Sequence, residues 1–209
     1  IKRGLVIFVG GTVTGKSTSL AAMVGFRNEN ACDHIITVED PIEYVHEHRK
    51  SIITQREVGI DTDNWFSALQ NTLRQAPDVI LLGEIRDREA METCLEAAQT
   101  GHLVLSTLHT TGAVKTLGRI LEMYPRENHS AVLNRLSEIL IFIHSQGLLN
   151  GTDRRVLTYE FLQNSDDAIS AAIAGYDGGA RSLEDAIRRA GNIQWDANPK
   201  RPLNQGRIT

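Results

Sequence analysis

The sequence of 209 residues predicts an α/β fold in which helices cover both faces of a mostly parallel β-sheet. Two features of the chain carry this prediction. Short, wholly apolar segments alternate with longer segments that have the composition of helices, which is the order of strand and crossover helix in a parallel sheet. The apolar segments also lack the polar and apolar alternation of a strand with one face in water, so we expect both faces of the sheet to be buried.

The first two strands enclose a glycine-rich turn and a helix. Residues 5–9 are apolar and are followed by two glycines, and the segment from residue 16 to about 27 has the length and composition of a helix. Residues 35–38 form a second apolar segment, which ends in an acidic cluster that a proline interrupts. The composition of residues 52–55 predicts a third strand.

Two crossover helices and two core strands follow. Apolar residues recur at helical spacing over 64–76, and a proline ends this pattern just before an apolar strand at 79–82. Residues 88–99 are good helix formers, a glycine ends the helix, and residues 103–108 form another continuous apolar strand.

The segment after Pro125 has a different composition and predicts a smaller, mainly helical C-terminal region. The elements expected there are a helix at about 127–140, a strand pair at 141–149 and 156–162, and short helices at 166–174 and 182–190. Prolines and asparagines without periodicity predict an irregular tail at the end of the chain. We therefore divide the chain into a core over 1–125, an extension of helices and strands over 126–191 and a tail over 192–209.

The composition excludes several functional classes. With 41% hydrophobic and 23% charged residues, the chain is typical of globular proteins rather than of disordered ones. A net charge of -4 and a pI near 6.0 argue against a broad basic surface, so we expect no nucleic acid partner. The longest apolar segment, around residues 139–143, is far shorter than the roughly 20 residues that span a bilayer.

The cysteines and the first residue also bear on the origin of the chain. Cys32 and Cys94 lie far apart and outside any C-x-x-C pair, so the sequence predicts neither a disulfide framework nor a structural zinc, and a reducing compartment fits best. The chain begins with Ile1 and enters a strand almost at once. We therefore expect it to be part of a longer polypeptide.

The segment from Gly10 to Ser17 fits the phosphate-binding pattern G-x-x-x-x-G-K-[ST] and lies between a predicted strand and a predicted helix, as that motif requires. Backbone N–H groups of the loop and of the helix N-terminus are expected to surround the phosphates of ATP. Lys16 would reach the β- and γ-phosphates, and the Ser17 hydroxyl would ligate Mg²⁺. The candidate nucleotide-binding residues are Gly10, Gly11, Thr12, Val13, Thr14, Gly15, Lys16, Ser17 and Thr18.

Val13 is an unusual residue inside such a loop. Some positions of the loop require a positive φ, where a β-branched side chain is strained. Because the general pattern leaves this position open, two outcomes are consistent with the sequence. Either the loop binds nucleotide less well, or it adopts a conformation that valine tolerates.

Carboxylates follow two of the predicted strands. Glu84 comes after the apolar strand at 79–82, where it would point from the sheet edge toward a bound nucleotide, as in a Walker B element. Gly83 stands where an aspartate is usual, so the carboxylate on the Mg²⁺ side of the site is either dispensed with or supplied by Glu39 or Asp40, with Asp40 acting through water. A hydrolytic site needs a carboxylate to orient or deprotonate water, and Glu84 and Glu39 both qualify by placement.

His109 and three arginines complete the set of candidates. His109 follows the strand at 103–108, where a neutral ring could donate to a γ-phosphate and report its loss. Arg74, Arg86 and Arg88 flank the acidic strand and could neutralise transition-state charge, within one subunit or across an interface. The alternative for these arginines is pairing with surface carboxylates.

Together these segments closely resemble the secretion ATPases of type II and type IV pilus systems, and the pilus retraction group (PilT and PilU) matches best. The resemblance covers residues 1–125 and includes four family elements, namely a Walker A loop, an Asp box, a Walker B segment with glycine before its glutamate, and a His box. The matching segments are residues 4–17, 36–43, 53–59, 73–78, 83–87 and 100–110.

The resemblance implies a RecA-like ATPase domain that works in a homo-hexameric ring on the cytoplasmic face of the inner membrane and moves pilin subunits. Its implied partners are an inner-membrane platform protein and a paralogous ATPase. By position, Lys16 and Ser17 match the phosphate and Mg²⁺ contacts, Glu39 lies in the Asp box, Glu84 is the Walker B acid and His109 belongs to the His box. The family's N-terminal domain, which helps supply arginines in trans, is absent from this sequence.

Two departures from the family keep other functions open. Val13 replaces the usual glycine, and residues 145–150 read SQGLLN where the family has S-Q-R-L-L-P. These changes favour, as an alternative, a nucleotide-binding accessory ring subunit with little hydrolysis of its own. A small-molecule kinase is a weaker alternative, because the sequence has neither an arginine-rich lid nor an acceptor pocket. The lack of a four-cysteine zinc module favours the retraction branch or a related secretion ATPase.

Overall fold

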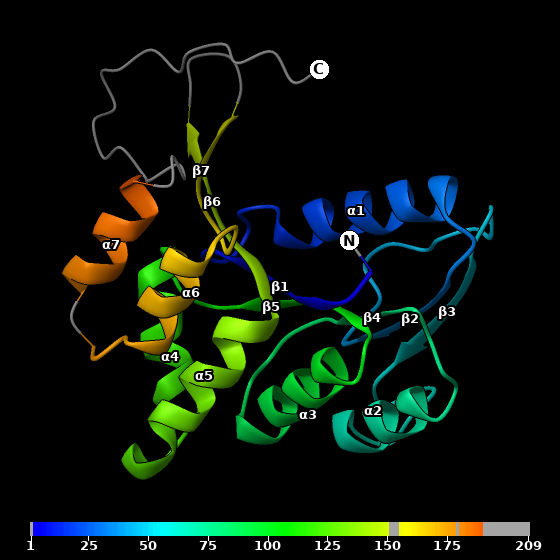
Figure 1. The fold of residues 1–209 in the computed structure, drawn as a ribbon. Helices are drawn as coiled ribbons and strands as arrows, with labels where there is room; N and C mark the ends of the chain where they lie inside the picture. The colour runs from blue at the N-terminus through cyan, green and yellow to red at the C-terminus, as the bar shows by residue number, and fades with distance from the viewer. Residues whose placement is uncertain (1, 151–154, 179, 190–209) are drawn as a thin grey trace.

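A seven-stranded sheet runs through the molecule and carries helices on both faces (Figure 1). The structure is a computed structural model that describes residues 2–150, 155–178 and 180–189. Its strands are β1 (Gly4–Val9), β2 (His34–Glu39), β3 (Ile52–Glu57), β4 (Val79–Leu82), β5 (Leu103–Leu108), β6 (Leu140–Asn150) and β7 (Arg155–Gln163). Its helices are α1 (Lys16–Asn30), α2 (Trp65–Leu73), α3 (Arg88–Gln99), α4 (Ala113–Leu121), α5 (His129–Ile139), α6 (Asp167–Ala174) and α7 (Ala180–Arg189).

The strands lie in the order β3-β2-β4-β5-β1-β6-β7. Every neighbouring pair is parallel except β6 and β7, which form an antiparallel hairpin at one edge. The prediction of a mostly parallel sheet is therefore confirmed. Because parallel strands end at the same edge, the residues that follow β1, β2, β4 and β5 meet there.

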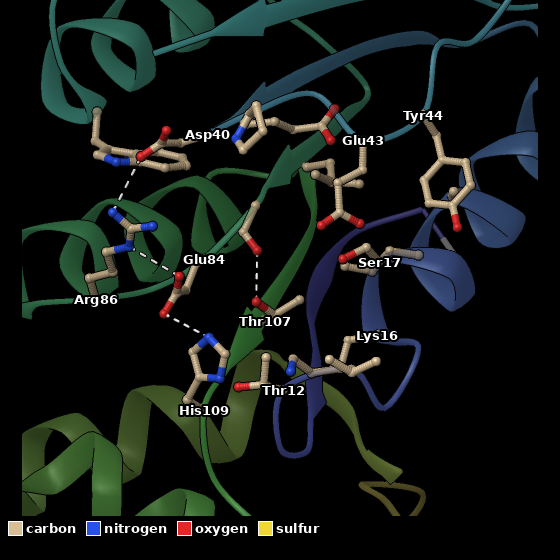
Figure 2. Close-up of a pocket in the computed structure, with 18 of the residues that line it drawn as sticks. Thr12, Lys16, Ser17, Asp40, Glu43, Tyr44, Glu84, Arg86, Thr107 and His109 are labelled. Atoms are coloured by element: carbon tan, nitrogen blue, oxygen red, sulfur yellow. Dashed lines mark hydrogen bonds and ion pairs between the residues drawn. The ribbon is translucent and has the colours of Figure 1, made fainter. Parts of the chain in front are cut away.

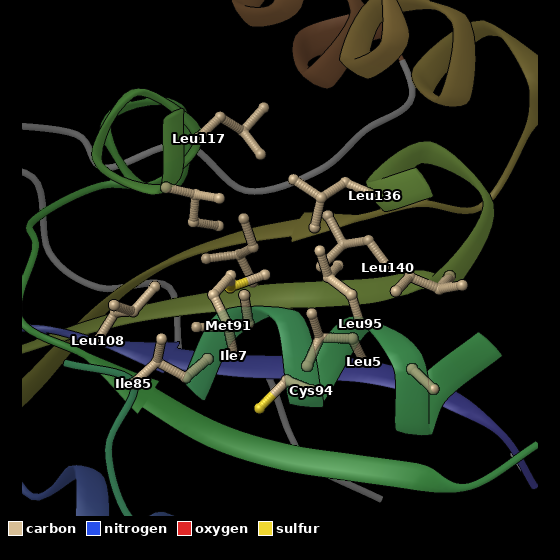
Figure 3. Close-up of a cluster of buried hydrophobic side chains, with 14 of the residues drawn as sticks. Leu5, Ile7, Ile85, Met91, Cys94, Leu95, Leu108, Leu117, Leu136 and Leu140 are labelled. Atoms are coloured by element: carbon tan, nitrogen blue, oxygen red, sulfur yellow. The ribbon is translucent and has the colours of Figure 1, made fainter. Parts of the chain in front are cut away.

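The two faces of the sheet are buried against different helices, as the continuous apolar strands predict. Strands β1, β4 and β5 are buried at every residue. On one face, Leu20 and Val24 of α1 pack with alternate residues of β1 such as Val6. On the other face, Leu95 of α3 packs beside Leu5, which precedes Val6 in β1 (Figure 3). This second cluster extends to α4, α5, α6 and α7.

Cys94 of α3 belongs to this second cluster and is fully buried. Burial raises the pKa of its thiol to about 12, so the group stays protonated and packs as a small apolar side chain. Cys32 is exposed, and neither cysteine forms a disulfide.

The predicted elements agree with the observed ones to within a few residues, with one omission. The structure adds α4, whose apolar residues Val114, Leu117 and Ile120 recur at helical spacing and are buried. The sequence does contain this signal, but the N-cap of α4 is Gly112, which has no side chain to cap the helix, so no start signal separates α4 from the preceding strand. The helix expected at about 127–140 begins instead with a 3₁₀ turn at Arg126–Asn128, and α5 ends where β6 begins.

The C-terminal elements extend the same sheet and the same core. Strand β6 pairs with β1 in parallel, from Leu5 opposite Leu140 to Val9 opposite Ser145, with a shift of register after the first pair. Helices α6 and α7 contribute Ile169 and further buried residues to the cluster that includes α3. The tail expected at 192–209 lies outside the described residues. Within the described part of the chain, each helix is too short or too polar to cross a membrane.

Candidate nucleotide-binding site

The phosphate-binding pattern forms the loop between β1 and α1. Gly15 has a φ of 87° and caps the start of α1, so a residue with a Cβ would be strained there. Gly10 is required for a different reason, because a Cβ at this position would lie 2.3 Å from the backbone oxygen of Gln146. The first amides of α1 have no acceptor within the helix and face the loop, as an anion-binding helix N-terminus requires.

Val13 adopts a φ of 62° in this loop, so the positive φ suspected from the sequence is confirmed. A β-branched residue is strained in this region of φ/ψ space. The residue is 74% exposed, so burial contributes little to offset the strain.

Lys16 is the first residue of α1, and its ammonium group points back into the loop that precedes the helix. Its Nζ donates to the carbonyl oxygens of Gly10 and Gly11, at 2.9 Å each. Burial lowers the pKa of Lys16, while the negative charges of Glu84 and Glu43 act in the opposite direction. The positive charge is therefore held between the loop and the carboxylates that face it.

A cavity of about 210 Å³ lies between this loop and the carboxyl ends of β2, β4 and β5 (Figure 2). It brings together residues that are as much as 97 positions apart along the chain, from Thr12 to His109. Of the predicted site residues, the cavity is lined by Thr12, Val13, Lys16, Ser17, Glu39, Asp40, Glu84, Arg86 and His109. Of the five remaining loop residues, Thr14, Gly15 and Thr18 line an adjoining cavity, Gly11 lines a third cavity, and Gly10 lines none of the three. The Thr18 hydroxyl lies 2.8 Å from the hydroxyl of Tyr44.

Glu84 is paired at both carboxylate oxygens. Its Oε1 lies 3.2 Å from Nε2 of His109, and its Oε2 accepts a hydrogen bond from Nε of Arg86 at 3.0 Å. Nη1 of Arg86 also contacts Oδ2 of Asp40 at 3.3 Å, and its guanidinium lies 5.8 Å from the ring centroid of Trp65. The hydrogen bond to Glu84 is the main cause that raises the pKa of Arg86. Arg86 thus connects the residues that follow β2 and β4.

Glu39 lies in the same cavity but has neutral partners. Its Oε1 accepts hydrogen bonds from the Thr37 hydroxyl at 2.8 Å and from Nε2 of Gln55 at 3.3 Å. The cavity therefore holds two carboxylates in different environments, with Glu84 between two basic groups and Glu39 between uncharged donors. Either one is placed to orient a water molecule.

The structure does not bring Arg74 or Arg88 into this cavity. Arg74 is the exposed C-cap of α2, in the connection that leads to the amino end of β4, whereas Glu84 follows the carboxyl end of that strand. Arg88 begins α3, and its guanidinium lies 5.3 Å from the ring centroid of Tyr124.

Several lining residues were not predicted as site residues. Trp65 is one of the apolar residues that recur at helical spacing in α2, so its sequence context indicates only packing. Thr107 lies within an apolar strand, so its context also indicates a core position. Thr107 donates its hydroxyl to the carbonyl oxygen of Gly83 at 2.7 Å and so fixes the backbone beside Glu84. Its position two residues before His109 is the signal that could have identified it.

The cavity also contains oxygen groups that suit Mg²⁺. Mg²⁺ prefers oxygen ligands, keeps several waters and binds through one or two protein oxygens together with substrate phosphates. The Ser17 hydroxyl and the carboxylates of Glu39, Asp40 and Glu84 line one space. Among the described residues, no three acidic, histidine or cysteine side chains cluster closely enough to hold a metal ion by themselves. These residues fit a Mg²⁺ that arrives with a nucleotide.

Comparison with known proteins shows which family shares this arrangement. Residues 1–184 match the family of the type II/IV secretion system protein. The chain is 47% identical over 211 residues to the type IV pilus ATPase PilU of Pseudomonas aeruginosa, an alignment that covers 100% of this chain and 55% of PilU. The chain thus spans about half the length of the curated relatives that it matches most fully.

Two solved structures have the same fold. A crystal structure of the pilus retraction motor PilT with bound ADP is 45% identical, with a TM-score of 0.81, over 91% of this chain and 53% of PilT. The ATPase DotB of Legionella pneumophila is 30% identical, with a TM-score of 0.85, over 93% of this chain and 54% of DotB. The prediction of a RecA-like P-loop fold is confirmed by these likenesses. The chain belongs to the type II/IV secretion system protein family and, within it, is similar to the pilus retraction ATPases.

Proposed function

We propose that this chain is the ATP-binding and ATP-hydrolysing part of a motor that drives type IV pilus retraction or a related secretion system. The observation that carries the proposal is the shared cavity, in which Lys16 and Ser17 of the phosphate loop face Glu84, Glu39 and His109. The similarity to PilU, a type IV pilus ATPase, and to PilT, a pilus retraction motor with bound ADP, supports both the reaction and the system.

Nucleotide binding would use the loop from Gly10 to Thr18. Its backbone amides and those of the first turn of α1 would accept the phosphates, with the helix N-terminus adding favourable charge. Lys16 would exchange its two carbonyl acceptors for β- and γ-phosphate oxygens. Ser17 and, through water, Asp40 would hold Mg²⁺, which supplies charge neutralisation for the phosphates when it is bound.

Hydrolysis would depend on the two carboxylates and their partners. Glu84 or Glu39 would orient and deprotonate the attacking water. His109, which contacts Glu84, would respond to the γ-phosphate, and Arg86 would stabilise the negative charge that develops. Each oxygen of Glu84 has one basic partner, which leaves a second lone pair on each oxygen for the attacking water.

The assembly of the motor is part of the same proposal. We place the chain in a homo-hexameric ring at the cytoplasmic face of the inner membrane, in contact with a platform protein and a paralogous ATPase. In such a ring, Arg74 would act across a subunit interface, since it is exposed and lies away from the cavity of its own chain.

One observation favours a second function. Val13 holds a strained positive φ in the loop that would bind the phosphates. A loop with this strain fits an accessory ring subunit that binds nucleotide and hydrolyses little of it. The two functions differ in turnover, not in binding.

Steady-state phosphate release by the full-length protein tests the proposal. We expect measurable release by the parent, loss of release in Lys16→Ala through loss of binding, and a decrease of about 100-fold or more in Glu84→Gln with nucleotide binding retained. Glu47→Gln, the same chemical change at a side chain that is 85% exposed, is the matched control and should behave as the parent does. Equal rates in all four proteins would contradict a hydrolytic role. Binding without release by the parent would favour the accessory subunit.

A further inference from the structure

Strand β6 brings a buried glutamine against the phosphate loop. Because β6 runs parallel to β1, with Val9 opposite Ser145, the next residue of β6 lies beside the start of the loop. That residue, Gln146, is 3% exposed. It is separated from the loop by more than 120 residues of sequence, and although it is the glutamine of the segment that resembles the family's S-Q-R-L-L-P, the sequence does not connect that segment with the loop.

The side-chain amide of Gln146 uses both of its ends. Nε2 donates to the carbonyl oxygen of Thr14 at 2.7 Å, and Oε1 accepts from the hydroxyl of Ser19 at 2.9 Å. Thr14 lies near the end of the loop and Ser19 in the second turn of α1. A single planar amide therefore ties the loop to the helix that follows it.

The backbone of Gln146 lies close against the other end of the loop. A Cβ at Gly10 would lie 2.3 Å from the carbonyl oxygen of Gln146, and a Cβ at Gly15 would lie 3.3 Å from its Nε2. Two glycines of the phosphate-binding pattern thus allow close contact with one residue of β6. The loop fits against Gln146 at its beginning and at its end.

Inside the loop, the Thr14 hydroxyl donates to the carbonyl oxygen of Gly11 at 2.9 Å, but two other features do not fix the loop in this conformation. Val13 has a positive φ and is exposed, so it favours a different backbone conformation. The hydrogen bonds from Lys16 to Gly10 and Gly11 would be exchanged for phosphate oxygens on nucleotide binding. The bonds of Gln146 point to a backbone carbonyl and a helix hydroxyl, so a nucleotide has no need to displace them.

We propose that Gln146 is a positioning residue for nucleotide binding. It makes no contact with the phosphates itself, and it acts by holding the loop amides in the arrangement that receives them. This inference rests on the proposed function of the loop as a nucleotide site. It assigns to strand β6 a direct part in the affinity of that site.

Calorimetric titration of ADP with Mg²⁺ into full-length variants tests the inference. Gln146→Leu removes both hydrogen bonds, and Gln146→Glu keeps the shape but replaces the donor to Thr14 by an oxygen. We expect each to raise the Kd for ADP by about tenfold or more at pH 8, with the number of binding sites per chain unchanged. Gln70→Glu, on the exposed side of α2, is the matched control for the change of amide to carboxylate and should leave the Kd unchanged.

A pH series separates positioning from general stability. Protonation of the new carboxyl group in Gln146→Glu restores an O–H donor for the Thr14 carbonyl, so its Kd should approach the parent value as the pH falls from 8 to 6. Gln146→Leu should show no such recovery. Ser19→Ala, which leaves Gln146 in place and removes one bond, should raise the Kd by a few fold even if the larger changes prevent folding.

Two results would overturn the inference. In the first, the Gln146 variants bind ADP with the same Kd as the parent, but a smaller fraction of the chains binds. This result would mean that the glutamine only supports folding. In the second, the Gln146 variants fail to fold and Ser19→Ala binds ADP with the same Kd as the parent. A folded parent that binds no ADP would contradict the proposed function as well, and this outcome is recognised before any variant is compared.

Discussion

His109 and Glu84 meet across neighbouring strands, with Nε2 of the histidine 3.2 Å from Oε1 of the carboxylate. Glu84 follows β4 and His109 follows β5, so the contact depends on the parallel pairing of these two strands. Arg86 binds the other oxygen of the same carboxylate. The proposed catalytic carboxylate is thus oriented by two basic groups, one that follows β4 and one that follows β5.

We predict that His109→Gln lowers turnover by about tenfold and leaves the Kd for ADP unchanged. The reason is that the substitution removes the imidazole that contacts Glu84, while His109 lies outside the proposed phosphate loop. Paired measurements of kcat and of ADP affinity check this. His34→Gln, at the amino end of β2, is the control. A tenfold loss of ADP affinity in His109→Gln would place the histidine in binding instead.

Arg86 contacts both Glu84 and Asp40, and this double contact needs a planar guanidinium. We expect Arg86→Ala to lower kcat by about tenfold or more and Arg86→Lys to recover only part of the loss. The melting temperature should change little, because the arginine side chain is 52% exposed and exposed ion pairs contribute little to stability. Full activity in Arg86→Lys would show that charge alone is sufficient.

Val13→Gly should stabilise the protein by about 1 kcal/mol, since glycine adopts a positive φ without the strain of a β-branched residue. Chemical denaturation measures this difference. Val13→Ala is the matched control, because it shortens the side chain but retains a Cβ. It should gain less free energy of unfolding than Val13→Gly. A lower free energy of unfolding in Val13→Gly would mean that the valine is not strained. A large gain in turnover with glycine would support the accessory-subunit alternative.

Glu160 of β7 predicts a pH dependence of stability. Burial raises the pKa of Glu160, the N–H of Ala113 and the charge of Lys115 oppose this effect, and Glu184 adds to it. Because the pKa of Glu160 is higher in the folded state than in the unfolded state, folding favours its protonated form. The contribution of this group to stability is complete below about pH 4.5 and is lost as the pH rises through its folded-state pKa.

Glu160→Gln keeps an acceptor for Ala113 and cannot ionise. It should therefore be more stable than the parent near pH 8, and the difference should vanish near pH 4. Denaturation curves at several pH values, with Glu138→Gln on the exposed side of α5 as the control, measure this. A constant difference across the pH range would contradict the effect of burial on Glu160.

Local signals in the sequence predict most of the fold and the binding loop. The apolar strands and the segment from Gly10 to Ser17 depend on neighbours in the chain, and the structure places both as expected. The sequence order of the strands also places Glu39, Glu84 and His109 at one edge, because residues that follow parallel strands meet there.

Contacts between distant segments could not be predicted in this way. Arg74 is near Glu84 in sequence, but Arg74 precedes the amino end of β4 and Glu84 follows its carboxyl end. The two residues therefore lie at opposite ends of the strand. Gln146 reaches Thr14 only because β6 adds to the sheet beside β1. The spatial order of the strands, which decides that contact, has no local signal in the sequence.

The central claim is that the loop from Gly10 to Ser17 binds a nucleotide through its phosphates. Calorimetric titration of ADP with Mg²⁺ into the folded, full-length protein tests it most directly. The expected result is saturable heat with one nucleotide per chain, abolished in Lys16→Ala. No heat of binding from the folded parent, or equal binding by Lys16→Ala, would contradict the claim.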